Sequence, residues 1–299
     1  MINIEKSQKV YALLPNTGLG NRMLVWAKAY AFAKKYHLEL LTSSWWGVHW
    51  GAWFRKEKYK RVYFGYFKQA PFITHVKFIL FRLNALHISE PDHILMTTKN
   101  VVYVFHEVVT SSDYFETIKP FRDDIRQAIH HSLHSRLLRE LDTFKHPAIG
   151  IHIRRGDFKL GSTLTPESFF ISSILAIRKV VGIDLPVELF TDAFPEEIPL
   201  LLSLPNVHLT KSKPDILDLL LLSQSKICIL SIGSTFSFWG GFLSNGILLR
   251  HPDEWHPPIR PNAFNEFHYE SNFDPSKSID PCLIDHIRKI EFDTIAKNV

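Results

Sequence analysis

The fold is indicated by the stretch Gly150-Ile151-His152-Ile153-Arg154-Arg155-Gly156-Asp157-Phe158, in which an apolar run ends in two arginines, a glycine and an aspartate. The run predicts a buried strand over residues 148–153. Further strands are predicted at 187–191, 207–210, 227–230 and 247–249, and helices at 215–224 and 235–243. Strands that alternate with helices indicate a parallel sheet covered on both faces, and ligands bind such sheets beyond the carboxyl ends of the strands. The loops after residues 153, 191 and 230 are therefore the expected place of a site.

The first half of the chain repeats the strand-to-helix pattern on a smaller scale. An apolar run at 10–14 is followed by the turn Gly18-Leu19-Gly20-Asn21, and apolar residues at helical spacing follow from Met23 to Ala31. Residues 101–105 predict another strand, and helices are predicted on either side of Pro120 within residues 114–141. A last helix is predicted over 283–296. We expect two units, an N-terminal one over 1–145 and a C-terminal one over 146–299.

The composition is that of an ordinary globular protein and excludes several classes. The 299 residues carry a net charge of +5, and this field is too weak to favour a nucleic-acid partner. The polar start of the chain does not predict a signal peptide, and no apolar run reaches the roughly 18 residues that span a bilayer. A cytoplasmic protein is expected. The stretch 71–86 predicts an amphipathic helix, for which packing on the core is preferred over contact with a membrane surface.

The paired arginines are the sharpest chemical signal. Neighbouring side chains of a strand point to opposite faces, so Arg154 and Arg155 are expected to differ in function. One can enter a ligand site, where a guanidinium fork suits a diphosphate, while the other ties the strand to its surroundings. His152 lies on the same face as Arg154. An ion pair between an arginine and Asp157 explains the same spacing equally well.

Three other segments carry weaker signals. Asn21 follows the glycine turn at a helix start, where backbone amides attract anions, but an ordinary turn explains it as well. Ser234 and Thr235 open a predicted helix, where they can cap it or hold phosphate. Asp218 on the preceding helix can accept hydrogen bonds from a guanine edge, or be an exposed helix charge.

Two further features bear on ligands. The sequence has no DxD triplet, and thus lacks the usual carboxylate pair through which a divalent metal holds a sugar-nucleotide diphosphate. Tryptophans and tyrosines crowd residues 42–68, a composition that suits sugar rings, although a buried aromatic cluster is the preferred interpretation. His130 and His134 lie one helical turn apart but lack the glutamate of HExxH, and are expected to be solvated.

Together these segments resemble the α-1,2-fucosyltransferases (glycosyltransferase family 11) and the related α-1,6- and protein O-fucosyltransferases. The resemblance rests on Gly18-Leu19-Gly20-Asn21, His152 to Phe158, Phe190-Thr191-Asp192-Ala193, and Asp218 to Ser223 followed by Ser234 to Trp239, and it spans residues 18–239. The sequence departs from the family pattern at Arg22, at Ile232-Gly233 and at Gly240-Gly241.

The resemblance implies an α/β fold of GT-B type, with two Rossmann-like lobes that face a cleft. It implies GDP-fucose as donor, no metal or other cofactor, and inversion at the fucose carbon. Arg154 would hold the diphosphate, His152 and Asp218 the guanosine, Ser234 and Thr235 the phosphate oxygens. Asn21 would reach the donor from the other lobe. Asp157 is the candidate general base, and Arg155 would be structural.

The expected function is transfer of fucose from GDP-fucose to O2 of a β-galactoside in an oligosaccharide or glycoconjugate acceptor. The N-terminal lobe would bind the acceptor and the C-terminal lobe the donor. Two alternatives keep the donor site: a fucosyltransferase of another linkage, and a GDP-sugar-binding protein without catalysis.

Overall fold

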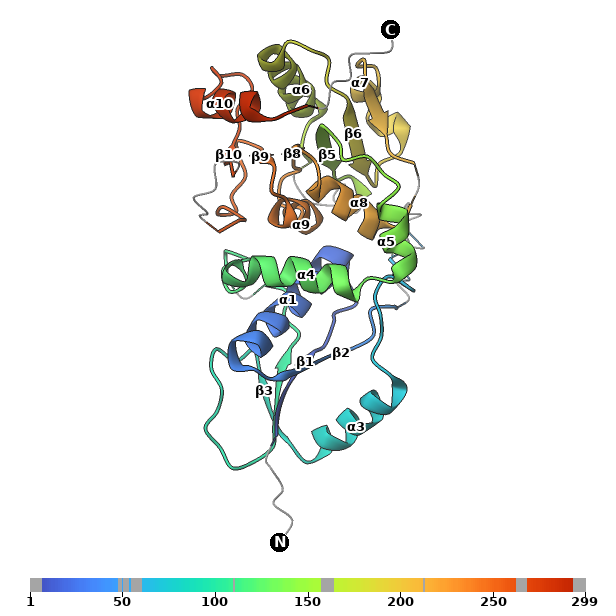
Figure 1. Cartoon of the computed structure of the whole chain (residues 1–299), viewed down its shortest axis with the longest axis vertical. Coiled ribbons are helices and arrows are strands. Elements are labelled where there is room, and N and C mark those ends of the chain that lie inside the picture. Colours follow the sequence, from blue (N-terminus) through green and yellow to red (C-terminus); the bar gives the residue numbers. More distant parts are fainter. Residues whose placement is uncertain are drawn as a thin grey trace. The chain divides into compact units, whose positions relative to one another are not determined.

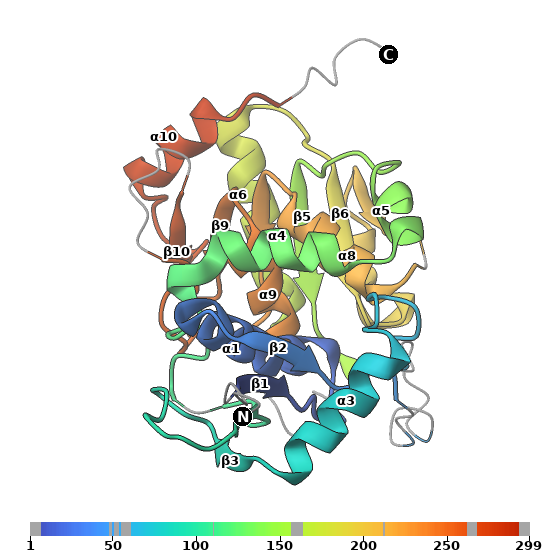
Figure 2. The ribbon, with the colours of Figure 1, turned by 60° about the horizontal axis from the view of Figure 1, so that its bottom comes forward.

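The chain divides into two compact units, each of which is described by itself. The computed structural model describes residues 7–47, 50, 54, 61–109, 111–156, 164–211, 213–261 and 268–292. The first unit comprises Met1–His49 and Arg61–Leu138, and the second comprises Trp50–Lys60 and Arg139–Val299. The chain thus passes between the units three times, after His49, after Lys60 and after Leu138, whereas the sequence predicted a single boundary after residue 145. Figures 1 and 2 show the elements of both units.

The first unit is built on a sheet in the order β2-β1-β4-β3, in which all neighbouring strands are parallel. Val101, Tyr103 and Phe105 of β4 pack with residues of helix α1, whereas Val102 and Val104 pack with Phe78 of helix α3. Alternate residues of a strand point to opposite faces, so the two helices cover opposite faces of this sheet. The elements are β1 (Gln8–Ala12), α1 (Leu19–Tyr36), β2 (Glu39–Thr42), α3 (Phe72–Leu83), β3 (Leu86–Ser89), β4 (Val101–Phe105), the 3₁₀ turn η1 (Lys119–Phe121) and α4 (Arg122–Ser132).

The second unit contains a wholly parallel sheet in the order β10-β9-β8-β5-β6-β7. The chain runs outward from β5 to β7, returns to β8 beside β5, and runs outward again to β10. This is the strand order of the Rossmann fold, in which the order reverses between the first and fourth strands. Helix α5 (Ser135–Leu141) crosses from the first unit into the second. The other elements are β5 (Ile149–Ile153), α6 (Glu167–Val181), β6 (Val187–Thr191), η3 (Pro195–Glu197), α7 (Pro199–Leu202), β7 (Val207–Leu209), α8 (Asp215–Ser223), β8 (Ile227–Ile229), α9 (Thr235–Leu243), β9 (Ile247–Arg250), β10 (Glu270–Asn272) and α10 (Pro281–Lys289).

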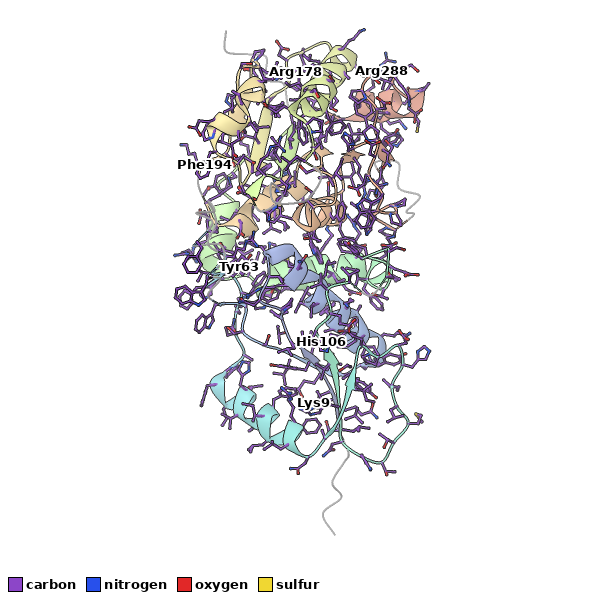
Figure 3. The ribbon with its side chains drawn as sticks, turned by 180° about the vertical axis from the view of Figure 1, so that it is seen from behind. Lys9, Tyr63, His106, Arg178, Phe194 and Arg288 are labelled. Atoms are coloured by element: carbon purple, nitrogen blue, oxygen red, sulfur yellow. The ribbon has the colours of Figure 1, made fainter. Side chains whose placement is uncertain are left out.

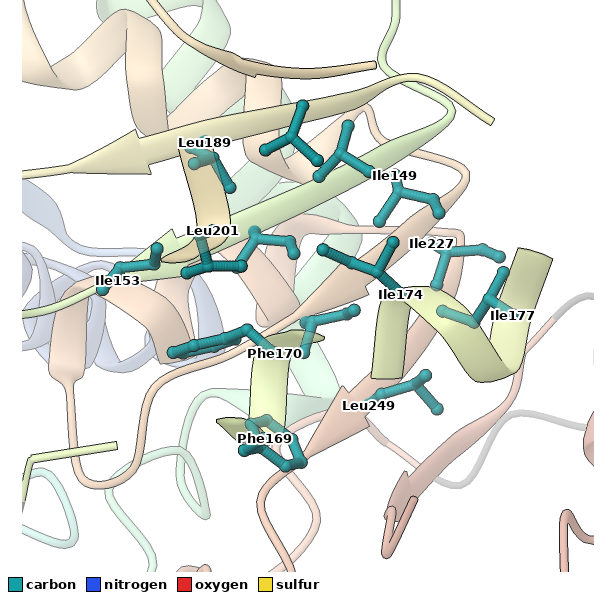
Figure 4. Packing of buried hydrophobic residues seen from close by; sticks show 14 of the residues in the cluster. Ile149, Ile153, Phe169, Phe170, Ile174, Ile177, Leu189, Leu201, Ile227 and Leu249 are labelled. Atoms are coloured by element: carbon teal, nitrogen blue, oxygen red, sulfur yellow. The ribbon is translucent and has the colours of Figure 1, made fainter. Parts of the chain in front are cut away.

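The core of the second unit lies where α6 covers the sheet. Figure 4 shows side chains of β5, β6, β8 and β9 meeting Phe169, Phe170, Ile174 and Ile177 of α6. On the other face of β5, Gly150 lies close to Leu222 of α8. Because helices cover both faces, all five residues of β5 are buried and its sequence is apolar up to His152. The carboxyl end of β5 is therefore held rigidly.

The α/β expectation is confirmed, and so are the predicted strands of the second unit. The predicted helix over 283–296 is shorter in the structure, because α10 ends at Lys289. Helix α6 and the short edge strands β2, β3 and β10 were not predicted. In the described part of the chain, no helix is long and apolar enough to cross a bilayer.

Candidate functional site

One hydroxyl group joins the carboxyl ends of β5 and β8, the two strands between which the strand order reverses. Ser231 Oγ donates to the His152 carbonyl at 2.9 Å and accepts from the Arg154 backbone N–H at 3.0 Å. In open parallel sheets, ligands bind beyond this point of reversal. Ser231 thus fixes the backbone of Arg154 at the expected place of a ligand site.

Arg154 forms an ion pair with Asp192, the residue that follows β6. The pair joins Arg154 Nη1 to Asp192 Oδ2, and the two side chains are 20% and 9% exposed. The sequence had offered Asp157 as the partner of an arginine, but Asp157 lies outside the described residues. Asp192 holds the guanidinium in one orientation while the side chain keeps access to solvent. A held, partly exposed guanidinium suits an anionic ligand.

Arg155 is buried and contacts the chain itself. Its Nη1 donates to the Arg154 carbonyl at 3.1 Å, and its backbone N–H donates to Asp192 Oδ1 at 2.7 Å. The next residue is glycine for a steric reason, since a Cβ at Gly156 would lie 2.4 Å from Asp192 Oδ2. The two arginines therefore differ as predicted, with Arg155 tying the strand end together.

His152 joins β5 to the first turn of α9. Its Nδ1 lies 2.6 Å from Ser237 Oγ, and its ring stacks on Phe236 with centroids 4.7 Å apart. Burial, with a smaller contribution from the Arg154 charge, lowers the pKa of His152 to about 3. The imidazole is therefore neutral and structural here, and its contact with a nucleoside stays a prediction.

Acid is expected to destabilise the fold through His152. The pKa is about 3 in the folded chain and near 6.5 in the unfolded chain, so the unfolded chain binds the proton first. The neutral form of His152 contributes fully to the free energy of unfolding above pH about 6.5, and this contribution is lost progressively towards pH about 3. At pH 5 the free energy of unfolding should be lower by about 2 kcal/mol. Urea unfolding at neutral pH and at pH about 5 measures this loss. It should be smaller in His152→Asn and unchanged in His130→Asn, which alters an exposed histidine; an equal loss in His152→Asn would contradict the assignment.

The start of α9 brings hydroxyl groups to the same edge of the sheet. Ser234 is the N-cap and accepts from the Ser237 backbone N–H at 3.3 Å, so it caps the helix as the sequence allowed. Thr235 is the first residue of α9 and is half-buried. Gly233 has a φ of +60°, and its N–H donates to Glu254 at 2.9 Å. The positive end of the α9 dipole thus lies at the same edge of the sheet as Arg154, and the Glu254 carboxylate accepts a hydrogen bond there.

Asp218 is buried on α8, which excludes the exposed helix charge that the sequence offered as an alternative. Its Oδ1 lies 2.9 Å from Lys213 Nζ, and both side chains are 4% exposed. Lys213 also lies over the ring of Phe190, 5.6 Å from its centroid. The guanosine contact of Asp218 stays a prediction.

Asn21 belongs to the first unit, where it lies half-buried in the first turn of α1. The neighbouring Arg22 is buried and organises the preceding turn. It donates to the Trp45 carbonyl, to Asn16 Oδ1 at 3.1 Å and to the Thr17 carbonyl at 3.2 Å. The departure from the family pattern at position 22 thus has a structural purpose in this chain.

The aromatic segment is partly a buried cluster, as preferred from the sequence. Trp45 is 6% exposed and lies 4.1 Å from Phe67 between ring centroids. Tyr63, labelled in Figure 3, is 3% exposed and packs 5.1 Å from the Arg22 guanidinium. By contrast, Trp46 is 54% exposed. Trp53 and Tyr59 lie outside the described residues.

We also searched the described residues for side chains that could ligate a metal ion. Among them, no group of three or more His, Cys, Asp or Glu side chains is close enough to hold a metal ion. His130 and His134 are exposed, as predicted. Metal independence stays a prediction.

Sequence reasoning did not single out Lys213, and it gave Asp192, Ser231 and Ser237 no specific partner, although Asp192 and Ser237 lie in the motifs that carry the resemblance. Asp192 and Ser231 follow strands whose ends had been predicted as the place of a site, so their position was a usable signal. Their partners lie far away in the chain: Arg155 is 37 residues from Asp192, and His152 is 79 residues from Ser231. Local spacing could not have supplied these pairs.

No family model and no curated protein sequence matches the chain. Several solved structures are similar to it. They include NodZ α-1,6-fucosyltransferase soaked with GDP-fucose, with 16% identity and a TM-score of 0.47, covering 80% of this chain and 94% of that one. A variant of Arabidopsis thaliana FUT1 in complex with GDP has 13% identity and a TM-score of 0.49, covering 93% and 80%. POFUT1 in complex with GDP-fucose has 10% identity and a TM-score of 0.49, covering 81% and 94%. Likenesses at this level do not assign the chain to a family.

Proposed function

We propose that the chain is an inverting glycosyltransferase that moves L-fucose from GDP-fucose to a sugar hydroxyl, namely O2 of a β-galactoside. The observation that carries the proposal is Arg154, held by Asp192 and Ser231 where the strand order of a Rossmann-type sheet reverses. The motifs around Arg154 and around Ser234 to Trp239 resemble those of fucosyltransferases, and they follow β5 and β8, which are neighbouring strands of one sheet.

The donor diphosphate would lie between the Arg154 guanidinium and the start of α9. Charge grows on the diphosphate as the bond to fucose breaks, so a fixed guanidinium stabilises the transition state more than the ground state. The backbone amides at the helix start add to this effect. Asp192 contributes by keeping Arg154 in place before the donor binds.

The acceptor hydroxyl would attack from the side opposite GDP in a single displacement. Such a hydroxyl is helped by a general base. Asp157 is our candidate from the sequence, and Trp46 is a candidate surface for the acceptor sugar. No metal is assigned to this mechanism.

Titration calorimetry in EDTA tests the donor site. We expect GDP and GDP-fucose to bind. UDP-galactose should bind at least about tenfold more weakly, because the protein groups that would hydrogen-bond the guanine edge stay unpaired with uracil. Binding that requires Mg²⁺ would contradict the metal-free site, and no guanosine binding by folded protein would contradict the proposal.

Product analysis tests the reaction itself. Incubation with GDP-fucose and lactose should release GDP and form a product whose linkage NMR reports. An α-1,2 product supports the full proposal, and another linkage retains the donor but corrects the acceptor. Donor binding without turnover on any galactoside would favour a GDP-sugar-binding protein.

A further inference from the structure

We propose that the outer face of α3 docks onto the surface of a membrane that contains anionic lipids. Helix α3 covers one face of the first unit's sheet, and its outward side is apolar instead of polar. Phe72, Ile73, Ile79, Leu80 and Leu83 are 57% to 82% exposed. A soluble surface helix normally presents polar side chains there, so this face indicates a binding surface.

The apolar residues form one continuous strip. At about 100° per residue, the side chains of Phe72, Ile73, Val76, Ile79, Leu80 and Leu83 fall within an arc of about 120° that contains no charged residue. The opposite side holds Phe78, which is 4% exposed and packs with Leu41, Val102 and Val104. The outward direction of the strip is thus fixed by the packing of the sheet.

The inner side of α3 is anchored by stacked side chains. The Phe78 and Tyr11 ring centroids lie 4.9 Å apart, and the Arg82 guanidinium lies 5.0 Å from the Tyr11 ring. Lys9, labelled in Figure 3, lies over Phe81 at 5.4 Å from its centroid. These contacts make the strip a stable surface of the folded chain.

The charges beside the strip favour an anionic partner. Lys77, which is exposed, borders it on one side, and His75 borders it on the other, while Arg82 lies beyond His75 with its guanidinium over Tyr11. From Arg61 to Ser89 the sequence contains four Lys or Arg residues and no Asp or Glu. The next acid, Glu90, is paired with Lys28 at 3.1 Å and accepts from the backbone N–H groups of residues 106 and 107. Basic residues that flank an apolar helix face are typical of interfacial helices.

The length of α3 fits a helix that lies in the membrane plane. Its 12 residues extend about 18 Å, which is well short of the hydrocarbon core that a spanning helix must cross. A second copy of this chain fits less well, because antiparallel pairing of two such faces would bring the Lys77 ammonium groups of the two copies to the same side of the interface. Lipid phosphates complement the same charges.

Flotation of the whole chain with vesicles tests the proposal. We expect binding to vesicles of phosphatidylcholine with phosphatidylglycerol, weaker binding to phosphatidylcholine alone, and a decrease in high salt. The double substitution Leu80→Glu and Leu83→Glu should lower the partition coefficient at least about tenfold, because two apolar contacts are replaced by charges that anionic lipids repel.

The matched control is Leu175→Glu with Leu200→Glu in the second unit. These leucines are 51% and 60% exposed, close to the 58% of Leu80. The control therefore adds the same two negative charges at exposed leucines, but away from α3. The control should bind vesicles as the unchanged chain does, and circular dichroism should show that both variants fold. Failure of the unchanged chain to bind anionic vesicles, or equal binding by the α3 variant, would overturn the proposal. So would a dimer in sedimentation equilibrium that the α3 variant abolishes.

Discussion

Arg154→Ala is expected to lower kcat by a factor of about 10² to 10³ and to weaken GDP binding, by analogy with the loss of one oxyanion-hole donor. The guanidinium is 20% exposed and is held by Asp192, so in the proposed donor complex it would meet the diphosphate without prior reorganisation. Its removal takes away a hydrogen-bond donor that would stabilise the diphosphate more strongly as negative charge develops on this leaving group. Steady-state kinetics with GDP-fucose and calorimetry with GDP measure the two effects.

Two variants separate this effect from general loss of charge or of fold. Arg154→Lys keeps the charge but loses the planar fork, and should recover GDP binding more than turnover. Arg126→Ala removes a half-buried arginine of α4 that pairs with Asp123, and should leave both measurements unchanged. Normal GDP affinity in a folded Arg154→Ala protein would remove the basis of the proposed donor site.

The sequence predicted the elements best where burial leaves a clear apolar run. Strands β4 and β6 and helix α9 have the predicted bounds, because each is apolar and ends at polar or turn residues. The edge strand β10, with the sequence Glu-Ser-Asn, has no such run, and its pairing with β9 comes from the tertiary fold. The last helix was predicted too long because apolar residues continue past Lys289, where the backbone becomes extended at Ile290.

The sequence predicted where the candidate site residues gather, but not which groups they contact. Arg154, His152 and Ser234 gather at one edge of the sheet because parallel strands end together. What the sequence could not supply is the partner of each group. Arg154 pairs with Asp192, 38 residues away, and His152 with Ser237, 85 residues away. Such pairs depend on the order of strands in the sheet, which local spacing does not encode.

Asp192→Asn is expected to lower kcat/KM by a factor of about 10 to 100, through the position of Arg154. The substitution keeps the shape and leaves an oxygen that accepts from the Arg155 N–H, now at 2.7 Å, but it removes the charge that fixes the guanidinium. Arg154 can then adopt other rotamers, and part of the donor binding energy is used to order it. The loss should appear mainly in kcat, since turnover depends most on the guanidinium being in place.

A double-mutant cycle distinguishes positioning from a separate structural contribution. If Asp192 acts through Arg154, Asp192→Asn should lower kcat/KM hardly any further in a chain that already carries Arg154→Ala. The coupling free energy between the two substitutions would then be about 1 to 3 kcal/mol. If Asp192 serves only the fold, its cost would persist in that background and the thermal midpoint would fall by the same amount in both. Gly156→Ala offers an independent route to the same pair, because the new Cβ would approach Asp192 Oδ2 to 2.4 Å and displace it. Its effect on kcat should likewise vanish once Arg154 is alanine, since the carboxylate would then have no guanidinium to place.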